Sequence, residues 1–259
     1  TSNSVNFNVT NPVPTPTSRG TASATAGDAG FDLPVNGTNF IASSVVQWNG
    51  ASRVRTYVCP TLVTAAILTG DLTTLGSFAV TVFNPTPAGG TSNGQTFTVG
   101  NPVPTTTDIS PTDVLAGSSG FTLTVNGTNF VSSSVVKWNG SNRVTTFVNS
   151  TQVTAAILTG DLATAGTFPI TVFNPTPGGG TSGAQTFTVN NPVPTTTSIL
   201  PISKLVGATT FSLVVNGTNF VPTSVVRWNG STRSTTFVNS TQLSATILTA
   251  DLTIGGTFP

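Results

Sequence analysis

Charge is what this sequence most lacks. Charged residues make up 6% of its 259 positions and the formal net charge is +1, whereas ordinary domains carry about 25% charged residues. Nucleic acids and anionic membrane surfaces are bound through clustered lysine and arginine, so we expect neither as a partner. A net charge near zero instead favours association between like molecules.

Histidine, glutamate and methionine are also absent, and there is one cysteine. Without histidine, glutamate or a recurring pair of aspartates, the chain has no general base to activate its many serines and threonines. A zinc site is also excluded, because zinc is bound chiefly by cysteine and histidine side chains and the chain has one cysteine and no histidine. The sequence therefore predicts no enzyme, no cofactor and no metal site. The lone Cys59 cannot form an internal disulfide; we interpret it as a chance substitution near a turn, with an intermolecular bridge or a reactive thiol as the alternative.

Long apolar runs are missing as well. No stretch approaches the ~20 apolar residues of a membrane span, and the sequence contains neither a signal peptide nor an initiating methionine. We therefore expect no membrane insertion, and we expect the sequence to be a mature or excised piece of a protein.

The sequence does contain one repeat unit that occurs three times. The stretch Val125–Phe130, followed by Trp138-Asn139-Gly140, recurs 90 residues earlier and 90 residues later, and all three tryptophans belong to it. A fixed period of this kind indicates a repeat architecture. The expected divisions are residues 1–10 as the last strand of a preceding repeat, repeats at 11–100 and 101–190, and an incomplete repeat at 191–259 that lacks its last strands.

Within the middle repeat we expect about seven strands and no helix longer than one turn. Apolar and polar residues alternate over Phe121–Val125, which is typical of a half-buried strand, and Asn126-Gly127 then indicates a tight turn or bulge. The other expected strands are 105–109, 134–138, 144–148, 151–158, 168–173 and 185–189, with a short turn at 160–162 and a long hairpin loop at 174–180. Such short strands, separated by turn signals, predict an all-β fold of tandem immunoglobulin-like β-sandwiches.

The order of these motifs resembles the IPT/TIG family. The resemblance rests on Val125–Phe130, Ser134–Gly140, Thr171–Gly180 and Phe187–Val189 with the Asn-Pro-Val-Pro that follows. The first two motifs occur in all three copies and the others in the first two. It implies immunoglobulin-like domains of the kind found in plexins and transcription factors and, in tandem arrays, in bacterial surface and secreted proteins. The uncharged, threonine-rich composition is closer to the bacterial arrays, and the cysteines common in animal members are absent.

Two sets of aromatic residues recur once per repeat. Trp48, Trp138 and Trp228 have two interpretations, a platform for sugar rings or a plug in the sandwich core. One tryptophan per repeat, followed at once by Asn-Gly, favours the core. We also expect the second set in the core, namely Phe40, Phe130 and Phe220.

One arginine and one aspartate also recur, namely Arg53, Arg143 and Arg233 with Asp71, Asp161 and Asp251. We expect either an ion pair, worth about 0–1 kcal/mol on a surface, or a turn-capping role for the aspartate. Calcium needs six to eight oxygen ligands, which one aspartate per repeat does not supply. Sequons such as Asn126–Thr128 and Asn149–Thr151 we interpret as by-products of turn chemistry rather than glycan acceptors.

The linkers Asn101–Pro104 and Asn191–Pro194 contain almost no spare residues. Proline fixes φ and biases its predecessor toward extended geometry, so we expect short, semi-rigid joints between sandwiches roughly 35–45 Å long. We predict a non-catalytic structural protein, an extracellular filament or cell-surface rod of end-to-end repeats. The alternative is an adhesin stalk or a carbohydrate-binding accessory module of a larger secreted protein.

The expected partners are adjoining repeats or copies of the chain, head to tail, with glycans as a further option. A repeat without its last strands exposes a sheet edge that invites pairing. Either the sequence is one stretch of a longer covalent array, or a strand with Val5, Phe7 and Val9 from one subunit completes the third repeat of the next. Strand addition leaves the counterpart of Ile170–Asn174 missing, which favours the covalent array.

Overall fold

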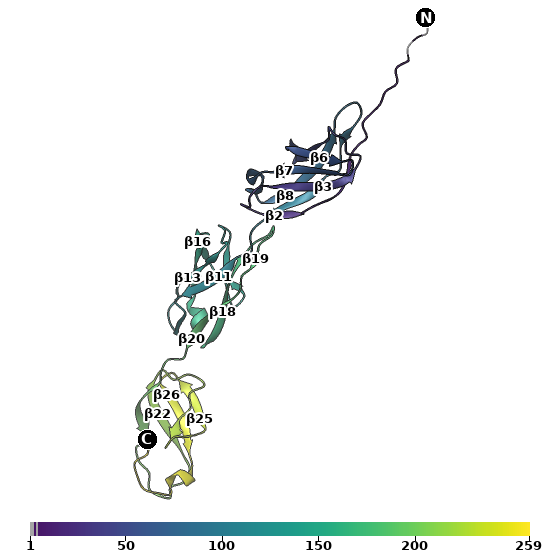
Figure 1. Ribbon diagram of the computed structural model, residues 1–259. Helices are drawn as coiled ribbons and strands as arrows, with labels where there is room; N and C mark the ends of the chain where they lie inside the picture. Colours follow the sequence, from purple (N-terminus) through teal and green to yellow (C-terminus); the bar gives the residue numbers. More distant parts are fainter. Residues whose placement is uncertain (1–2, 4) are drawn as a thin grey trace. The chain divides into compact units, whose positions relative to one another are not determined.

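The computed structural model describes residue 3 and residues 5–259, shown as a ribbon in Figure 1. Within these residues every regular element is a strand, apart from three single turns of 3-10 helix. None of the helices described is long and apolar enough to cross a membrane. The strands form three tandem β-sandwich units, which confirms the predicted all-β fold class.

The first repeat contains ten strands and one 3-10 turn. They are β1 (Thr15–Arg19), β2 (Ser23–Thr25), β3 (Phe31–Thr38), β4 (Val45–Trp48), β5 (Ala51–Ser52), β6 (Arg55–Cys59), β7 (Leu62–Ile67), η1 (Thr69–Leu72), β8 (Gly76–Asn84), β9 (Gly90–Thr91) and β10 (Gln95–Gly100). Seven of these strands have four or more residues, and β2, β5 and β9 are shorter.

The second repeat has the same elements in the same order. They are β11 (Thr105–Ser110), β12 (Asp113–Leu115), β13 (Phe121–Thr128), β14 (Val135–Trp138), β15 (Ser141–Asn142), β16 (Thr145–Asn149), β17 (Gln152–Ile157), η2 (Thr159–Leu162), β18 (Gly166–Asn174), β19 (Gly180–Thr181) and β20 (Gln185–Asn190). Its seven longer strands coincide with the seven expected from the sequence to within a few residues at each end.

The third repeat contains fewer strands. They are β21 (Thr195–Leu200), β22 (Phe211–Thr218), β23 (Arg227–Trp228), β24 (Ser231–Thr232), β25 (Thr235–Asn239) and β26 (Gln242–Ile247), followed by η3 (Thr249–Leu252). Four of them form the sheet β21-β22-β26-β25, whereas β23 and β24 form a two-stranded sheet. Positions equivalent to 170–190 would lie beyond residue 259.

Two sheets enclose the core of the first repeat. One has the order β1-β3-β7-β6 and the other β2-β10-β8-β4-β5, with β9 paired to β8. Burial alternates along β7, because successive side chains of a strand point to opposite faces. The buried side chains of the two facing sheets form one cluster that includes Leu33, Val35, Val63, Ala65, Ile67, Val46, Trp48, Val80, Val82, Phe97 and Val99.

One local prediction is wrong. Asn126-Gly127 is not a turn, because β13 continues to Thr128 and the positive φ falls on Asn129, at 62°. Glycine is needed for close packing instead, since a Cβ on Gly127 would lie 1.9 Å from the carbonyl oxygen of Thr105. The bulge is in the facing strand, where the register of β11 shifts between Thr106 and Asp108.

Candidate functional site

A set of recurrent polar residues meets at the start of the first and second repeats and holds the linker. In the second repeat the linker is Asn101–Pro104. Its first residue bonds to the loop after β18, residues 175–179. Asn101 Nδ2 donates to Pro175 O at 2.7 Å, its backbone N–H donates to Pro177 O at 2.7 Å, and Gly179 N donates to Asn101 O at 2.7 Å. Three bonds from one residue fix both its side chain and its backbone.

Asn174, the last residue of β18, holds the next linker residue. Its Nδ2 donates to Pro102 O at 2.9 Å and to Asn129 O at 2.7 Å, while its Oδ1 accepts from Ser134 Oγ at 2.6 Å. The side chain of Asn174 is fully buried. A buried amide group without hydrogen-bond partners destabilises the fold by about 1–3 kcal/mol. The bonds of Asn174 to Pro102, Asn129 and Ser134 are therefore required for its burial.

Asn129 completes the contact. Its Nδ2 donates to Val103 O at 3.0 Å, and its left-handed backbone conformation follows directly from the end of β13. We call Asn129, Ser134, Asn174 and the loop 175–179 the linker clamp. It contains no ionisable side chain, so its hydrogen bonds do not depend on protonation.

The first repeat has the same clamp, built from Asn39, Ser44, Asn84 and the loop 85–89. Asn84 Nδ2 donates to Pro12 O at 2.8 Å and to Asn39 O at 2.8 Å, and Ser44 Oγ donates to Asn84 Oδ1 at 2.5 Å. The remaining bonds are Asn11 Nδ2 to Pro85 O at 2.7 Å, Asn11 N to Pro87 O at 2.8 Å, Gly89 N to Asn11 O at 2.9 Å and Asn39 Nδ2 to Val13 O at 3.0 Å.

The clamp loop depends on a glycine that no other residue replaces. Gly179 has φ at +68°, and a Cβ placed on it would lie 2.3 Å from Asn174 O and 2.7 Å from Pro175 O. Gly89 in the first repeat has φ at +70° and the same clash, 2.3 Å from Asn84 O. The Gly-Gly sequence is therefore more than a hairpin tip, because it folds the loop back onto the linker.

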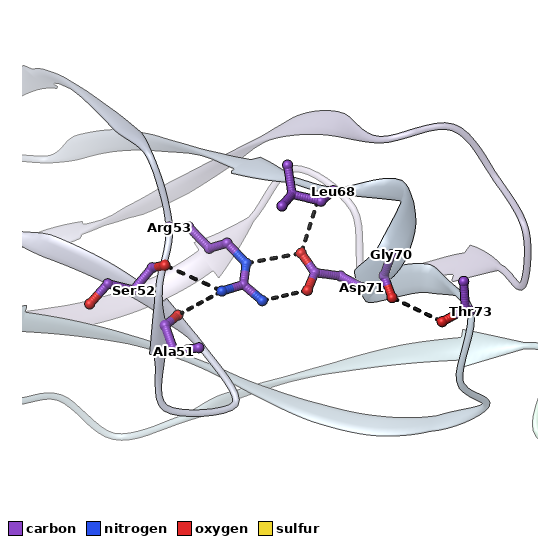
Figure 2. A network of polar contacts seen from close by, with 7 residues as sticks. All are labelled: Ala51, Ser52, Arg53, Leu68, Gly70, Asp71 and Thr73. Atoms are coloured by element: carbon purple, nitrogen blue, oxygen red, sulfur yellow. Dashed lines mark hydrogen bonds and ion pairs between the residues drawn. The ribbon is translucent and has the colours of Figure 1, made fainter.

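Figure 2 shows a second recurrent contact, between Arg53 and Asp71. Arg53 Nε donates to Asp71 Oδ2 at 2.9 Å, and Arg53 Nη2 forms an ion pair with Oδ1. Asp71 Oδ2 also accepts the backbone N–H of Leu68 at 2.9 Å. One carboxylate thus both pairs with the arginine and caps the η1 turn. Arg233 and Asp251 are joined in the same way.

These contacts change the acidity of both aspartates. Burial raises the pKa of Asp71, but the Arg53 hydrogen bond, the Leu68 N–H and the Arg53 charge outweigh it, so the pKa lies below its ordinary value. The pKa of Asp251 is also lowered, chiefly by the Arg233 hydrogen bond. Both carboxylates are therefore held ionised, as turn-fixing groups rather than proton donors.

The recurrent aromatic residues lie in the interior. Trp48 and Trp138 are 4% and 3% exposed, and Trp228 is half-buried. Trp48 stacks on Phe78 with centroids 5.3 Å apart and lies 5.1 Å from Phe97. The recurrent phenylalanines Phe40, Phe130 and Phe220 are 2%, 2% and 5% exposed. Trp48 and Trp138 therefore offer no open platform.

Other residues singled out from the sequence lie apart from the clamp. Val5, Phe7 and Val9 are 92%, 90% and 77% exposed. The thiol of Cys59 lies 3.2 Å from Thr61 Oγ1. The described residues contain no group of three or more histidine, cysteine, aspartate or glutamate side chains that would hold a metal ion.

The clamp asparagines and serines were not predicted from the sequence. Their recurrence every 90 residues was visible, and Asn174 stands where an alternating apolar strand ends. The acceptors, however, are backbone carbonyls 45 and 72 positions away in the chain. Only the folded chain brings them together.

Comparison with known proteins identifies the repeat. Residues 104–189 match the model of the IPT/TIG domain. No curated protein matches the sequence at a significant level.

Solved structures give more distant likenesses. One is a crystal structure with a xylogluco-oligosaccharide, at 19% identity and a TM-score of 0.42 over 95% of this chain and 56% of that one. Another is the SGBP-B protein of the Bacteroides ovatus mixed-linkage glucan utilization locus with a heptasaccharide, at 17% identity and a TM-score of 0.26 over 88% and 56%. A third is the Yersinia pseudotuberculosis adhesin InvE, at 15% identity and a TM-score of 0.38 over 69% and 58%.

The chain thus spans a little over half the length of each of these three proteins. Similarities of this size carry no functional argument. The family match, taken with the recurrent strands and motifs, supports the assignment of the fold. Residues 104–189 are an IPT/TIG domain, the middle one of three tandem β-sandwich units.

Proposed function

We propose that the chain is a non-catalytic spacer of an extracellular protein, serving as the stalk of an adhesin or of another larger secreted protein. The observation that carries the proposal is the linker clamp. Recurrent polar side chains of the first two repeats, among them the buried Asn84 and Asn174, hold the linker and are not displayed to a ligand. A repeat organised around its own joint is suited to setting distance between the parts that it connects.

The joint between the first and second repeats leaves no free residue. Strand β10 ends at Gly100, and Asn101 is already bonded to the second repeat on its side chain, its N–H and its carbonyl. A linker of this kind lacks the freely rotating residues that make glycine- and serine-rich linkers flexible. We therefore expect the first and second repeats to keep a constant separation, which a stalk needs and a flexible tether does not provide.

Electron microscopy of the chain tests this proposal. We expect narrow particles whose successive densities are evenly spaced, with little variation in the angle at the joint between Gly100 and Asn101. The control inserts six residues of glycine and serine between these two positions and should broaden the distribution of angles. Equally broad distributions for the chain and the control would contradict a stiff spacer.

Carbohydrate binding is the function against which the spacer is tested. Sugar-binding faces use exposed aromatic rings, but the aromatic side chains that are exposed among the described residues are Phe7 and Phe147 alone. We expect no signal above background on a glycan array. Reproducible binding to one glycan class, weakened by Phe147→Ala in a chain that still folds, would replace the spacer with an accessory binding module.

A further inference from the structure

The strands next to the two linkers of the second repeat are paired with each other. The chain passes from the linker 101–104 through β11 into β12, and β20 is followed by the linker 191–194. Strands β12 and β20 lie side by side and run parallel. Strands β2 and β10 pair in the same parallel manner in the first repeat. The chain therefore enters and leaves each of these repeats through neighbouring strands.

Backbone and side-chain hydrogen bonds join the two strands of the second repeat. At one end of the pair the N–H of Thr188 donates to Thr112 O at 3.0 Å, and at the other the N–H of Ala116 donates to Asn190 O at 2.8 Å. Asn190 Nδ2 also donates to Asp113 Oδ2 at 2.8 Å. We call this set of contacts between β12 and β20, with its counterpart between β2 and β10, the terminal seam.

The first repeat has the same seam with different side chains. Its backbone bond from Ala26 N–H to Gly100 O, at 2.8 Å, corresponds to the bond that Asn190 accepts in the second repeat. Gly100 has no side chain to make a further contact. Instead Arg19 of β1 donates from Nη1 to Gln95 Oε1 of β10 at 3.3 Å. Both repeats thus add a side-chain bond between their first and last strands, from residues that do not recur.

The parallel direction of the pair decides how it responds to tension. When the linker before β11 and the linker after β20 are pulled apart, β12 is drawn toward its N-terminal end and β20 toward its C-terminal end. The two strands then slide past each other along their length, and all the bonds between them are stretched together. A single hydrogen bond contributes modestly to stability, so strands whose bonds break one at a time resist little. Bonds that must break together give a higher barrier to unfolding.

We propose that the first and second repeats bear tension along the chain and that the terminal seam is the element that resists it. The inference rests on the proposed spacer role, because a spacer attached at both ends transmits force between the parts that it connects. Forced unfolding is governed by the unfolding rate and not by equilibrium stability. The seam therefore raises the unfolding force in one pulling direction without making the repeat more stable in urea.

The pulling direction is tested in an optical trap with handles on cysteines in a Cys59→Asn background. Val103→Cys with Val193→Cys, both at exposed linker positions, stretches the seam along its length. The matched control combines Ser119→Cys, at an exposed position after β12, with the same Val193→Cys. It opens the seam from the C-terminal ends of both strands, one bond at a time. We expect the second repeat to unfold at a force roughly twofold lower in the control. Equal forces in the two directions would overturn the proposal.

The side-chain bond of the seam is tested by Asn190→Ala, pulled between residues 103 and 193. Asn190 is exposed, so the midpoint in urea should change little, whereas the unfolding rate at constant force should rise about fivefold. Asn142→Ala, at another exposed asparagine of the second repeat, is the control and should leave the rate unchanged. Equal rates for the two variants would contradict a seam that bears the load.

The two proposals fail in different ways. Low unfolding forces in both pulling directions, together with a narrow distribution of joint angles in micrographs, would overturn the load-bearing role and leave the spacer intact. A broad distribution of joint angles would contradict the spacer itself, whatever force the second repeat withstands.

Discussion

The two linkers with the sequence Asn-Pro-Val-Pro at 101–104 and 191–194 are identical in residues and different in environment. Asn101 is 7% exposed and Pro104 is buried, whereas Asn191 and Pro194 are exposed. The first linker is held by Asn129, Asn174 and the loop 175–179. The second keeps one of these contacts, from Asn219 Nδ2 to Val193 O at 2.9 Å.

The difference separates two sources of stiffness. Proline restricts φ in both linkers, so its contribution is the same in each. The clamp is complete in one of them only, because the counterparts of Asn174 and of the loop 175–179 would be positions 264–269, beyond the 259 residues of this sequence. We infer that the hydrogen bonds of the clamp, rather than the prolines, fix the linker on the repeat that follows it.

Asn174→Ala should give the largest loss of stability. It removes one donor group and one acceptor from a fully buried position, and it leaves the carbonyls of Pro102 and Asn129 and the hydroxyl of Ser134 without their partner. We expect the free energy of unfolding of the second repeat to fall by roughly 3 kcal/mol. Urea unfolding, monitored by hydrogen exchange of the amides in the second repeat, measures this loss of stability.

Asn149→Ala is the control for that change, because Asn149 is exposed at the end of β16. It should lower the free energy of unfolding by less than about 1 kcal/mol. Similar losses for both variants would show that Asn174 is an ordinary surface asparagine in effect. The clamp would then contribute nothing to the difference between the linkers.

Gly179→Ala should have the next largest effect. The new Cβ would meet backbone atoms at 2.3 Å and also requires a left-handed φ, so we expect a loss of roughly 2–3 kcal/mol and a linker that is released. Gly140→Ala is the control, because it has φ at +83° with open space around it and should cost about 1 kcal/mol. A smaller loss for Gly179→Ala than for Gly140→Ala would mean that the loop does not need its observed shape.

A structural feature can be predicted from the sequence when it depends on a residue's own side chain and spacing, and not when it depends on atoms that are distant in the chain. Alternation over Phe121–Val125 and the recurrence of Trp138 predict the strands and the core, because burial depends on the residue's own side chain and spacing. The role of Asn174 escapes the same reasoning. The contribution of a buried asparagine to stability depends on the hydrogen-bond acceptors that the fold places beside it, and for Asn174 these are backbone carbonyls of distant residues.

The prediction of a turn at Asn126-Gly127 is wrong for a related reason. Asn-Gly favours a positive φ, yet at this position glycine is required by the approach of Thr105 O from the neighbouring strand. The same dipeptide at 139–140 does take the positive φ values, 47° and 83°. Local preference decides the second case, and tertiary packing decides the first.

Acid should distinguish the ion pair from the clamp. The folded-state pKa of Asp71 is lowered, so its contribution to stability is complete above the unfolded value of about 3.9 and is lost as pH falls through the folded value. Arg53→Ala should cost up to about 1 kcal/mol at neutral pH, and this difference from the unmodified chain should shrink with acid. The Asn101 amide should stay protected over the same range. A difference that is independent of pH would contradict the ion-pair assignment.

Cys59→Asn should have the smallest effect. Asn149 and Asn239 occupy the equivalent positions, and each accepts bonds from the threonine two residues on. We expect an unchanged midpoint in urea and unchanged oligomer distribution under reducing and oxidising conditions. A loss of oligomers specific to the oxidised state would instead assign Cys59 to an intermolecular bridge.

Hydrogen exchange at Asn101 and Asn191 tests whether the clamp, rather than the prolines, stiffens the linker, because the two Asn-Pro-Val-Pro sequences are the same. Asn101 N–H donates to Pro177 O at 2.7 Å, so its exchange should be slowed to the level of the strands around it. Asn191 N–H should exchange at close to the rate of an unstructured peptide. Equal protection of Asn101 and Asn191 would show that the prolines alone stiffen the linker, and the clamp would lose its role.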